Sequence, residues 1–86
     1  MNKSSTLFLT KNERELILKY GYPFEEIEQQ LNEAEGKQII RVSDHKYWWE
    51  QVVVNLHISE TEQTNPELLK NLRTLIDRIA IETEMV

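Results

Sequence analysis

The sequence predicts a mainly helical domain, with four helices and one or two short strands. Two observations support this fold class. Apolar residues recur every three or four positions in several stretches, and the glycines and prolines (Gly21, Pro23, Gly36 and Pro66) all fall between those stretches. A third observation, the β-branched and aromatic segment Lys37–Ser59, leaves one alternative open. If that segment forms a β-hairpin, the order becomes ααββα and the class α+β.

Length and composition predict one domain, residues 1–86, with a flexible tail at 1–5 and a frayed end at 82–86. The net charge is −5 and cysteine is absent, so disulfides, thiolate nucleophiles and cysteine-built zinc sites are excluded. The apolar run Leu7–Leu9 is too short for a signal peptide, and no stretch is long enough to span a membrane. We therefore expect a cytoplasmic protein with no membrane contact.

The first helix is predicted to follow a short strand at Thr6–Leu9. Thr10 and Glu13 have the spacing of a capping box, in which each side chain bonds the other residue's amide. The helix that follows should bury three apolar side chains, those of Leu16, Ile17 and Tyr20. Gly21 suits the left-handed position that ends a helix.

A second helix is predicted from Pro23, which suits a first helical turn, to Gly36. Its apolar stripe is Phe24, Ile27, Leu31 and Ala34. Glutamates surround that stripe and make the rest of the helix acidic.

The central segment begins with a predicted strand, Gln38–Val42, that could pair with the strand at Thr6–Leu9. Tyr47–Ile58 fits either a strand or a helix, and the helix is favoured because Ser43 and Asp44 suit an N-cap and an acidic first turn. The predicted helix buries Trp48, Val52 and Leu56 and leaves Trp49 partly exposed. Val54 is the one apolar residue on its polar side.

The last helix has Asn65 as N-cap and Pro66 as its first residue. Its broad apolar stripe is Leu68, Leu69, Leu72, Leu75, Ile76 and Ile79. The breadth of this stripe favours packing within the chain. A homodimer is the alternative, with a seam of Leu68, Leu72, Leu75 and Ile79.

No group of residues in the sequence indicates catalysis, and we expect no enzyme activity, metal or cofactor. His45 and His57 are twelve residues apart, which corresponds to about 18 Å along a helix, too far to share a metal ion. The serines lack a nucleophile-elbow context, and two glycines cannot build a phosphate-binding loop.

Binding to another protein is the function that the sequence favours. Trp and Tyr are enriched at binding hot spots, so the predicted contact residues are Tyr47, Trp49 and the neighbouring Glu50. Glu26 and Glu33, from the acidic run between Lys19 and Lys37, complete the predicted site. Small size and acidity are typical of immunity, antitoxin and phage-encoded inhibitor proteins and of small adaptors.

A second hypothesis is nucleic-acid binding. Glu13–Tyr20 followed by Phe24–Leu31 resembles the first two helices of the helix-turn-helix in bacterial sigma-factor-type regulators. That resemblance implies a polar recognition helix next, but Ile39–Val42 is β-branched, and Glu28 stands where that fold uses a small residue. With a net charge of −5, we do not expect nucleic acid to be the main partner.

Overall fold

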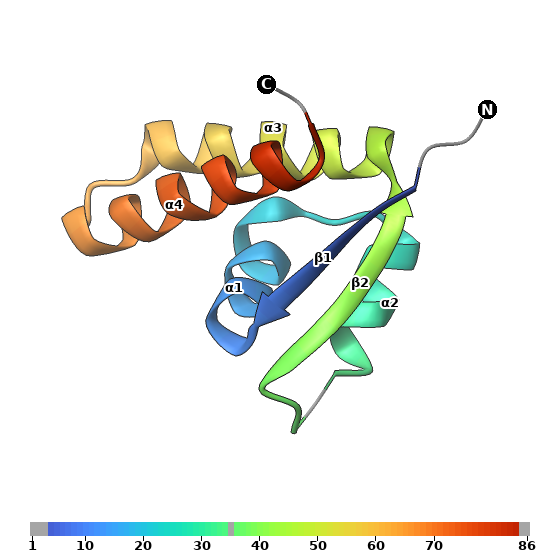
Figure 1. The fold of residues 1–86 in the computed structure, drawn as a ribbon. Coiled ribbons are helices and arrows are strands. Elements are labelled where there is room, and N and C mark those ends of the chain that lie inside the picture. The colour runs from blue at the N-terminus through green and yellow to red at the C-terminus, as the bar shows by residue number, and fades with distance from the viewer. Residues whose placement is uncertain (1–3, 35, 85–86) are drawn as a thin grey trace.

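The computed structural model describes residues 4–34 and 36–84, which form two strands and four α-helices (Figure 1). The elements in chain order are β1 (Ser4–Thr10), α1 (Lys11–Leu16), the π-helical turn η1 (Ile17–Gly21), α2 (Glu25–Asn32), β2 (Ile39–His45), α3 (Lys46–Glu62) and α4 (Pro66–Glu82). The mainly helical class with two short strands is confirmed. The central β-hairpin is not formed, because Lys46–Glu62 is one continuous helix.

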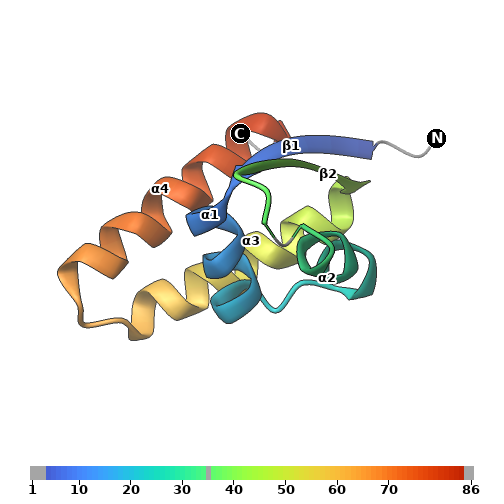
Figure 2. The ribbon, with the colours of Figure 1, turned by 90° about the horizontal axis from the view of Figure 1, so that it is seen from below.

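The two strands form an antiparallel ribbon, in which the N-terminal β1 pairs with β2 from the middle of the chain. Leu7 pairs with Val42 and Leu9 with Ile40, and these side chains turn toward the helices. Figures 1 and 2 show α1 and α2 on one side of the ribbon, with α2 beneath β2, and α3 and α4 as an antiparallel pair. The strand pairing expected between Thr6–Leu9 and Gln38–Val42 is confirmed, although both strands are longer than predicted.

Two of the predicted helix caps are confirmed. The Glu13 amide donates to Thr10 Oγ1 at 3.3 Å, and the Thr10 amide donates to Glu13 Oε1 at 2.9 Å, which completes the capping box. Asn65 Oδ1 accepts hydrogen bonds from the amides of Glu67 and Leu68, with Pro66 as the first residue of α4. These local signals could be read correctly because each depends on residues within one turn.

Three other boundary predictions are wrong. The left-handed residue after η1 is Tyr22, with φ of 44°, while Gly21 is the last residue of η1. Gly21 is needed for space, since a Cβ there would lie 3.1 Å from Val52 Cγ1. Pro23 lies before α2, whose N-cap is Phe24.

The third error concerns the start of α3. Its N-cap is His45, whose Nδ1 accepts a hydrogen bond from the Tyr47 amide at 3.1 Å. Ser43 belongs to β2 instead, because its hydroxyl bonds Thr6 Oγ1 at 2.6 Å and its backbone bonds Gln30. Long-range partners on β1 and α2 therefore extend the strand through the predicted cap.

Both predicted ends are more ordered than expected within the described residues. Ser4 and Ser5 were assigned to a tail at residues 1–5, but they pair with His45 and Asp44 in the ribbon. At the other end, α4 continues through Glu82, and Thr83 is buried with its hydroxyl donating to Ile79 O at 2.7 Å. Residues 1–3 and 85–86 of the predicted tail and frayed end lie outside the described residues.

The core lies between the ribbon and the four helices. Its buried side chains are Leu7, Leu9, Ile17, Ile27, Leu31, Val42, Trp49, Val52, Leu56, Leu72, Leu75 and Ile79. The stripe of α4 thus packs within the chain, as predicted. Leu72, Leu75 and Ile79 of the alternative homodimer seam are buried here and only Leu68 is partly exposed, which leaves no open apolar seam along them.

Candidate protein-interaction surface

The burial of the two tryptophans is the reverse of what the sequence predicted. Trp49 is fully buried, at 0% exposure, and its indole Nε1 donates to Ser5 O at 3.1 Å. Trp48 is only partly buried. Trp49 is therefore a core residue in this structure, and its predicted place on an exposed contact surface is wrong.

The reason for this reversal lies outside α3. Trp48, Val52 and Leu56 share a helix face at spacings of four, but Trp49, Val52 and Leu56 also share one at spacings of three and four. Helical periodicity alone cannot separate these two sets. The carbonyl of Ser5 decides between them, because it gives the buried indole N–H of Trp49 an acceptor.

Three aromatic rings meet at the start of α3. The ring of Phe24 stacks on Trp48 with centroids 4.2 Å apart, and Tyr47 meets the edge of Trp48 at 4.8 Å. Phe24 is 55% exposed and Tyr47 is 50% exposed. Stacked and edge-on pairs are favoured arrangements of aromatic rings, so the cluster presents a partly exposed apolar surface at the start of α3.

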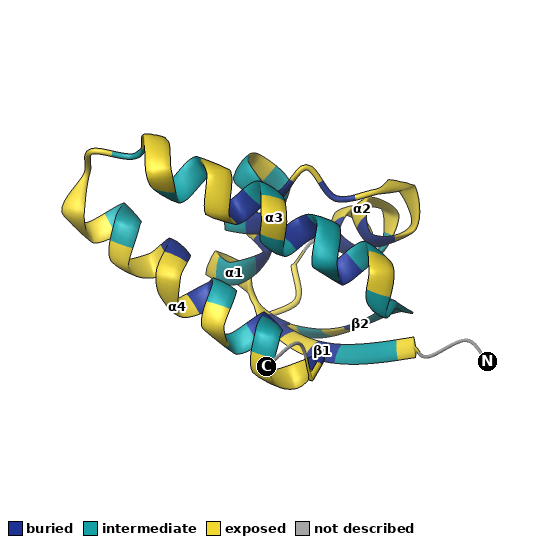
Figure 3. Cartoon of the chain, turned by 90° about the horizontal axis from the view of Figure 1, so that it is seen from above, coloured by how far each residue is buried: buried dark blue, intermediate teal, exposed yellow. Residues whose placement is uncertain are grey.

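An apolar stripe continues from this cluster along the outside of α3. Tyr47, Val54 and Ile58 are spaced by seven and four residues, which places them within about 20° of one line on the helix. Val54 is 50% exposed and Ile58 is 52% exposed. Figure 3 shows exposed positions recurring along α3. We call Phe24, Tyr47, Trp48, Val54 and Ile58 the α3 surface.

The predicted acidic residues divide between two places. Glu26 is exposed in the first turn of α2, two residues after Phe24, and Glu50 is partly exposed one turn after Tyr47. Glu33 lies at the opposite end of α2, where its Oε1 accepts a hydrogen bond from Gln29 at 3.2 Å. Glu26 and Glu50 therefore border the α3 surface, whereas Glu33 does not.

Ionic contacts hold the far end of α3 against α4. Glu60 Oε1 accepts from Arg73 Nε at 2.8 Å, and its Oε2 lies 3.1 Å from His57 Nδ1. The hydrogen bond from Arg73 lowers the pKa of the partly buried Glu60 carboxyl, with a smaller contribution from His57. The Arg73–Glu60 pair links the C-terminal part of α3 to α4, and the His57–Glu60 contact lies within α3.

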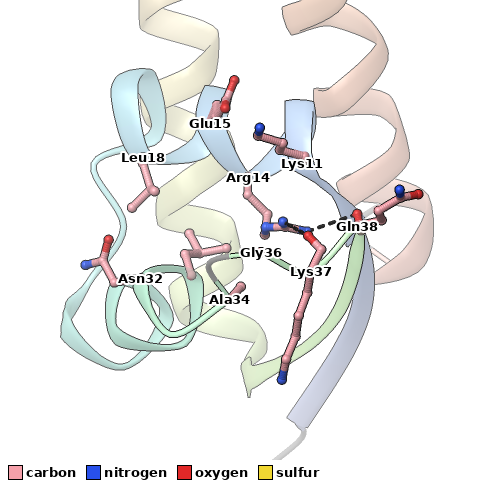
Figure 4. Close-up of a pocket in the computed structure, with 10 residues that line it drawn as sticks. Lys11, Arg14, Glu15, Leu18, Asn32, Ala34, Gly36, Lys37 and Gln38 are labelled. Carbon is pink, nitrogen blue, oxygen red and sulfur yellow. Dashed lines mark hydrogen bonds between the residues drawn. The ribbon is translucent and has the colours of Figure 1, made fainter.

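A pocket of about 630 Å³ lies between α1 and the segment after α2 (Figure 4). Arg14 is buried in its wall, and its guanidinium donates to Leu9 O at 3.0 Å, to Gln38 O at 3.2 Å and to Lys37 O. Figure 4 shows the Lys37 side chain extending away from Arg14. Because Arg14 binds backbone carbonyls, it joins α1 to β1 and to the segment before β2. Among the described residues that line the pocket, Glu15 is the one carboxylate, and none is a serine, cysteine or histidine.

Within residues 4–34 and 36–84, no three of the His, Asp and Glu side chains are grouped so that they could hold a metal ion. His45 is engaged as a helix cap and His57 with Glu60. In the same part of the chain, none of the helices combines the length and apolar character that crossing a membrane requires.

No family model, curated protein or solved structure matches the chain. The resemblance to a helix-turn-helix ends at α2, because the next element is the strand β2 where a recognition helix would follow.

Sequence reasoning missed four members of the α3 surface, namely Phe24, Trp48, Val54 and Ile58. Phe24 and Trp48 were assigned to buried stripes, because their spacing to other apolar residues is also that of a core face. The signal for the exposed stripe was Val54, the one valine on the polar side of the predicted helix. Together with Tyr47 and Ile58, it marks an apolar line opposite the face of Trp49, Val52 and Leu56.

Proposed function

We propose that this protein works in the cytoplasm by binding another protein through the α3 surface. An immunity, antitoxin or phage-encoded inhibitor protein, or a small adaptor, acts by this kind of contact. The observation that carries the proposal is the exposed apolar line Tyr47, Val54 and Ile58, which continues into the Phe24 and Trp48 stack.

Exposed apolar side chains are individually common, but several aligned on one helix face, beside an exposed aromatic stack, are typical of an interaction site. About three turns of α3 separate the cluster from Ile58, so a partner helix or loop can lie along the whole line. Two tight aromatic contacts fix Tyr47 and Phe24 before binding. Such rigid rings lose little conformational entropy on association, which favours their use as anchors.

The border of the α3 surface is acidic, which indicates a partner with basic residues around an apolar centre. Glu25, Glu26 and Glu28 lie in the first turn of α2 directly after Phe24, and Glu50 lies beside Tyr47 on α3. The whole chain carries a net charge of −5. Opposite charge on the rim speeds association and selects partners more than it adds affinity.

The test is affinity capture from cells of the encoding organism, with Tyr47→Ala and Val54→Asp as probes. Both sites are exposed, so the variants should keep the fold and lose at least about tenfold of the captured partner, as hot-spot truncations do. Ile81→Asp is the matched control, because Ile81 is 67% exposed on α4 and is not part of the α3 surface. Equal capture by all variants would reject the proposal.

A further inference from the structure

The outer edge of β2 carries backbone groups that lack partners within the described residues. Gln30 shows which groups these are, because the Ser43 amide donates to Gln30 Oε1 at 3.0 Å and Gln30 Nε2 donates to Ser43 O at 2.9 Å. An outward Ser43 amide means that alternate residues, Arg41 and Ile39, also direct N–H and C=O away from β1. Within residues 4–34 and 36–84, no hydrogen bond to these outward groups is found.

The Gln30 side chain occupies the position that one residue of a third strand would take. Its amide makes the same pair of bonds to Ser43 that a neighbouring strand makes. Beyond it, a groove of about 370 Å³ follows the β2 edge. The lining residues are Gln30, Glu33, Ala34, Lys37, Ile39, Ile40 and Arg41. Figures 1 and 2 show α2 beneath β2, so this helix can cover the inner face of an added strand.

We infer that an extended, acidic segment of another protein adds to β2 as a third strand beside Ile39 and Arg41. An open edge offers its hydrogen bonds to any extended chain, and partner proteins use such edges for strand addition. This inference goes beyond the proposed function, since the edge of β2 and the α3 surface are separate contacts.

The positive charge along the outer edge of β2 favours an acidic partner segment over a basic one. Two cations, Arg41 and Lys37, are exposed and line the groove, against the one lining carboxylate, Glu33, whose Oε1 accepts a hydrogen bond from Gln29. In the described part of the chain no carboxylate lies within salt-bridge distance of Arg41. A side chain directly opposite Arg41 in an added strand lies beside it on the outer face of the sheet. An Asp or Glu at that position therefore pairs with Arg41, and its two neighbours face inward over Ala34 and Ile40.

The test uses a phage-displayed library of random linear twelve-residue peptides, panned against the full chain, with enriched peptides then synthesised for affinity measurement. Peptides with an acidic residue between two apolar ones are expected. Arg41→Pro should weaken binding by about tenfold, because proline removes the outward N–H while keeping the inner ladder. Arg41→Ala, which keeps the backbone donor, should weaken binding by about threefold.

Gln30→Ala should have the opposite effect on peptide affinity. It frees the Ser43 N–H and C=O for the peptide, so binding should strengthen by about threefold. A second readout keeps the test valid if Arg41→Pro does not fold. In the wild-type chain, peptide binding should slow amide hydrogen exchange at Ile39 and Arg41. Failure to enrich any peptide, or peptides that bind without protecting these two amides, would overturn the inference. Tyr47→Ala should leave peptide binding unchanged, which separates this result from the α3 surface.

Discussion

The ring of Phe24 lies nearly parallel to the indole of Trp48, with centroids 4.2 Å apart and planes 8° apart. This contact joins the start of α2 to the first turn of α3, although 24 positions separate the two residues. It also explains how both aromatic side chains remain ordered while much of Phe24 is exposed. The Phe24–Trp48 stack forms the part of the α3 surface where α2 meets α3.

Phe24→Leu should lower the free energy of unfolding by about 0.5–1.5 kcal/mol, the value of an aromatic pair beyond its buried area. Denaturant unfolding measures the effect. Phe8→Leu is the matched control, because Phe8 is similarly exposed at 58% and belongs to neither aromatic pair. Equal losses for the two variants would mean that stacking on Trp48 adds no stability.

Trp49→Ala should cost about 3–5 kcal/mol of unfolding free energy, because it opens a cavity in the core. Trp49→Phe keeps most of the apolar volume but loses the hydrogen bond from the indole to Ser5 O, and should cost about 1–2 kcal/mol. Trp48→Ala, at a partly exposed site, should cost less than Trp49→Ala. Thermal and denaturant unfolding rank the three variants, and a larger loss for Trp48→Ala would contradict the observed burial.

Gly21→Ala should destabilise the chain by about 1 kcal/mol, since crowding Val52 outweighs the better helix propensity of alanine. The added methyl would lie 3.1 Å from Val52 Cγ1 and 3.4 Å from Ile17 Cγ2. In a Val52→Ala background the crowding is relieved, and Gly21→Ala should become neutral or stabilising. A double-mutant cycle measures this change of sign, and simple additivity would contradict the steric account.

Acidification should weaken the link from α1 and β1 to α4. Burial of the Glu13 carboxyl works to raise its pKa, but hydrogen bonds from Arg78 and Thr10 outweigh it and hold the pKa below the ordinary 4.5. A lowered folded-state pKa means that the stabilisation is present above about pH 4.5 and is lost as pH falls through the folded-state value. Arg78 also donates to Phe8 O, so this ion pair connects three elements.

Unfolding measurements from pH 6 to pH 3 test the link. Glu13→Gln should be less stable than the wild-type chain at pH 6, and the difference should shrink toward pH 3. Glu15→Gln, an exposed neighbour on α1, is the control and should follow the wild-type curve. A Glu13→Gln curve parallel to that of the wild-type chain would show that the ion pair contributes nothing.

Much of the fold could be predicted from sequence signals that act within a few residues. The capping box at Thr10 and Glu13 and the Asn65 and Pro66 start of α4 are complete within a few residues, so their prediction needed no tertiary structure. The Ser43 cap failed because Gln30 and Thr6, far away in sequence, bind Ser43 in a strand. Competing long-range partners decide such boundaries, and a single sequence does not reveal them.

For the candidate site, too, local features were predicted correctly and features that depend on long-range contacts were not. Tyr47 and Glu50 were predicted on an exposed stretch, and both are at least partly exposed on α3. Trp49 was misplaced because two helical registers fit the same apolar residues, and only the Ser5 carbonyl distinguishes them. Phe24 joins the surface through a contact between α2 and α3, which spacing within either helix could not indicate.

The most direct measurement is photo-cross-linking in cells with benzoylphenylalanine at position 54, in the middle of the α3 surface. We predict one major covalent adduct with a partner protein, and that Tyr47→Ala abolishes it. The same probe at Lys70, an exposed site on α4, should give no such adduct. Equal cross-linking from positions 54 and 70, or an adduct that survives Tyr47→Ala, would contradict binding through the α3 surface.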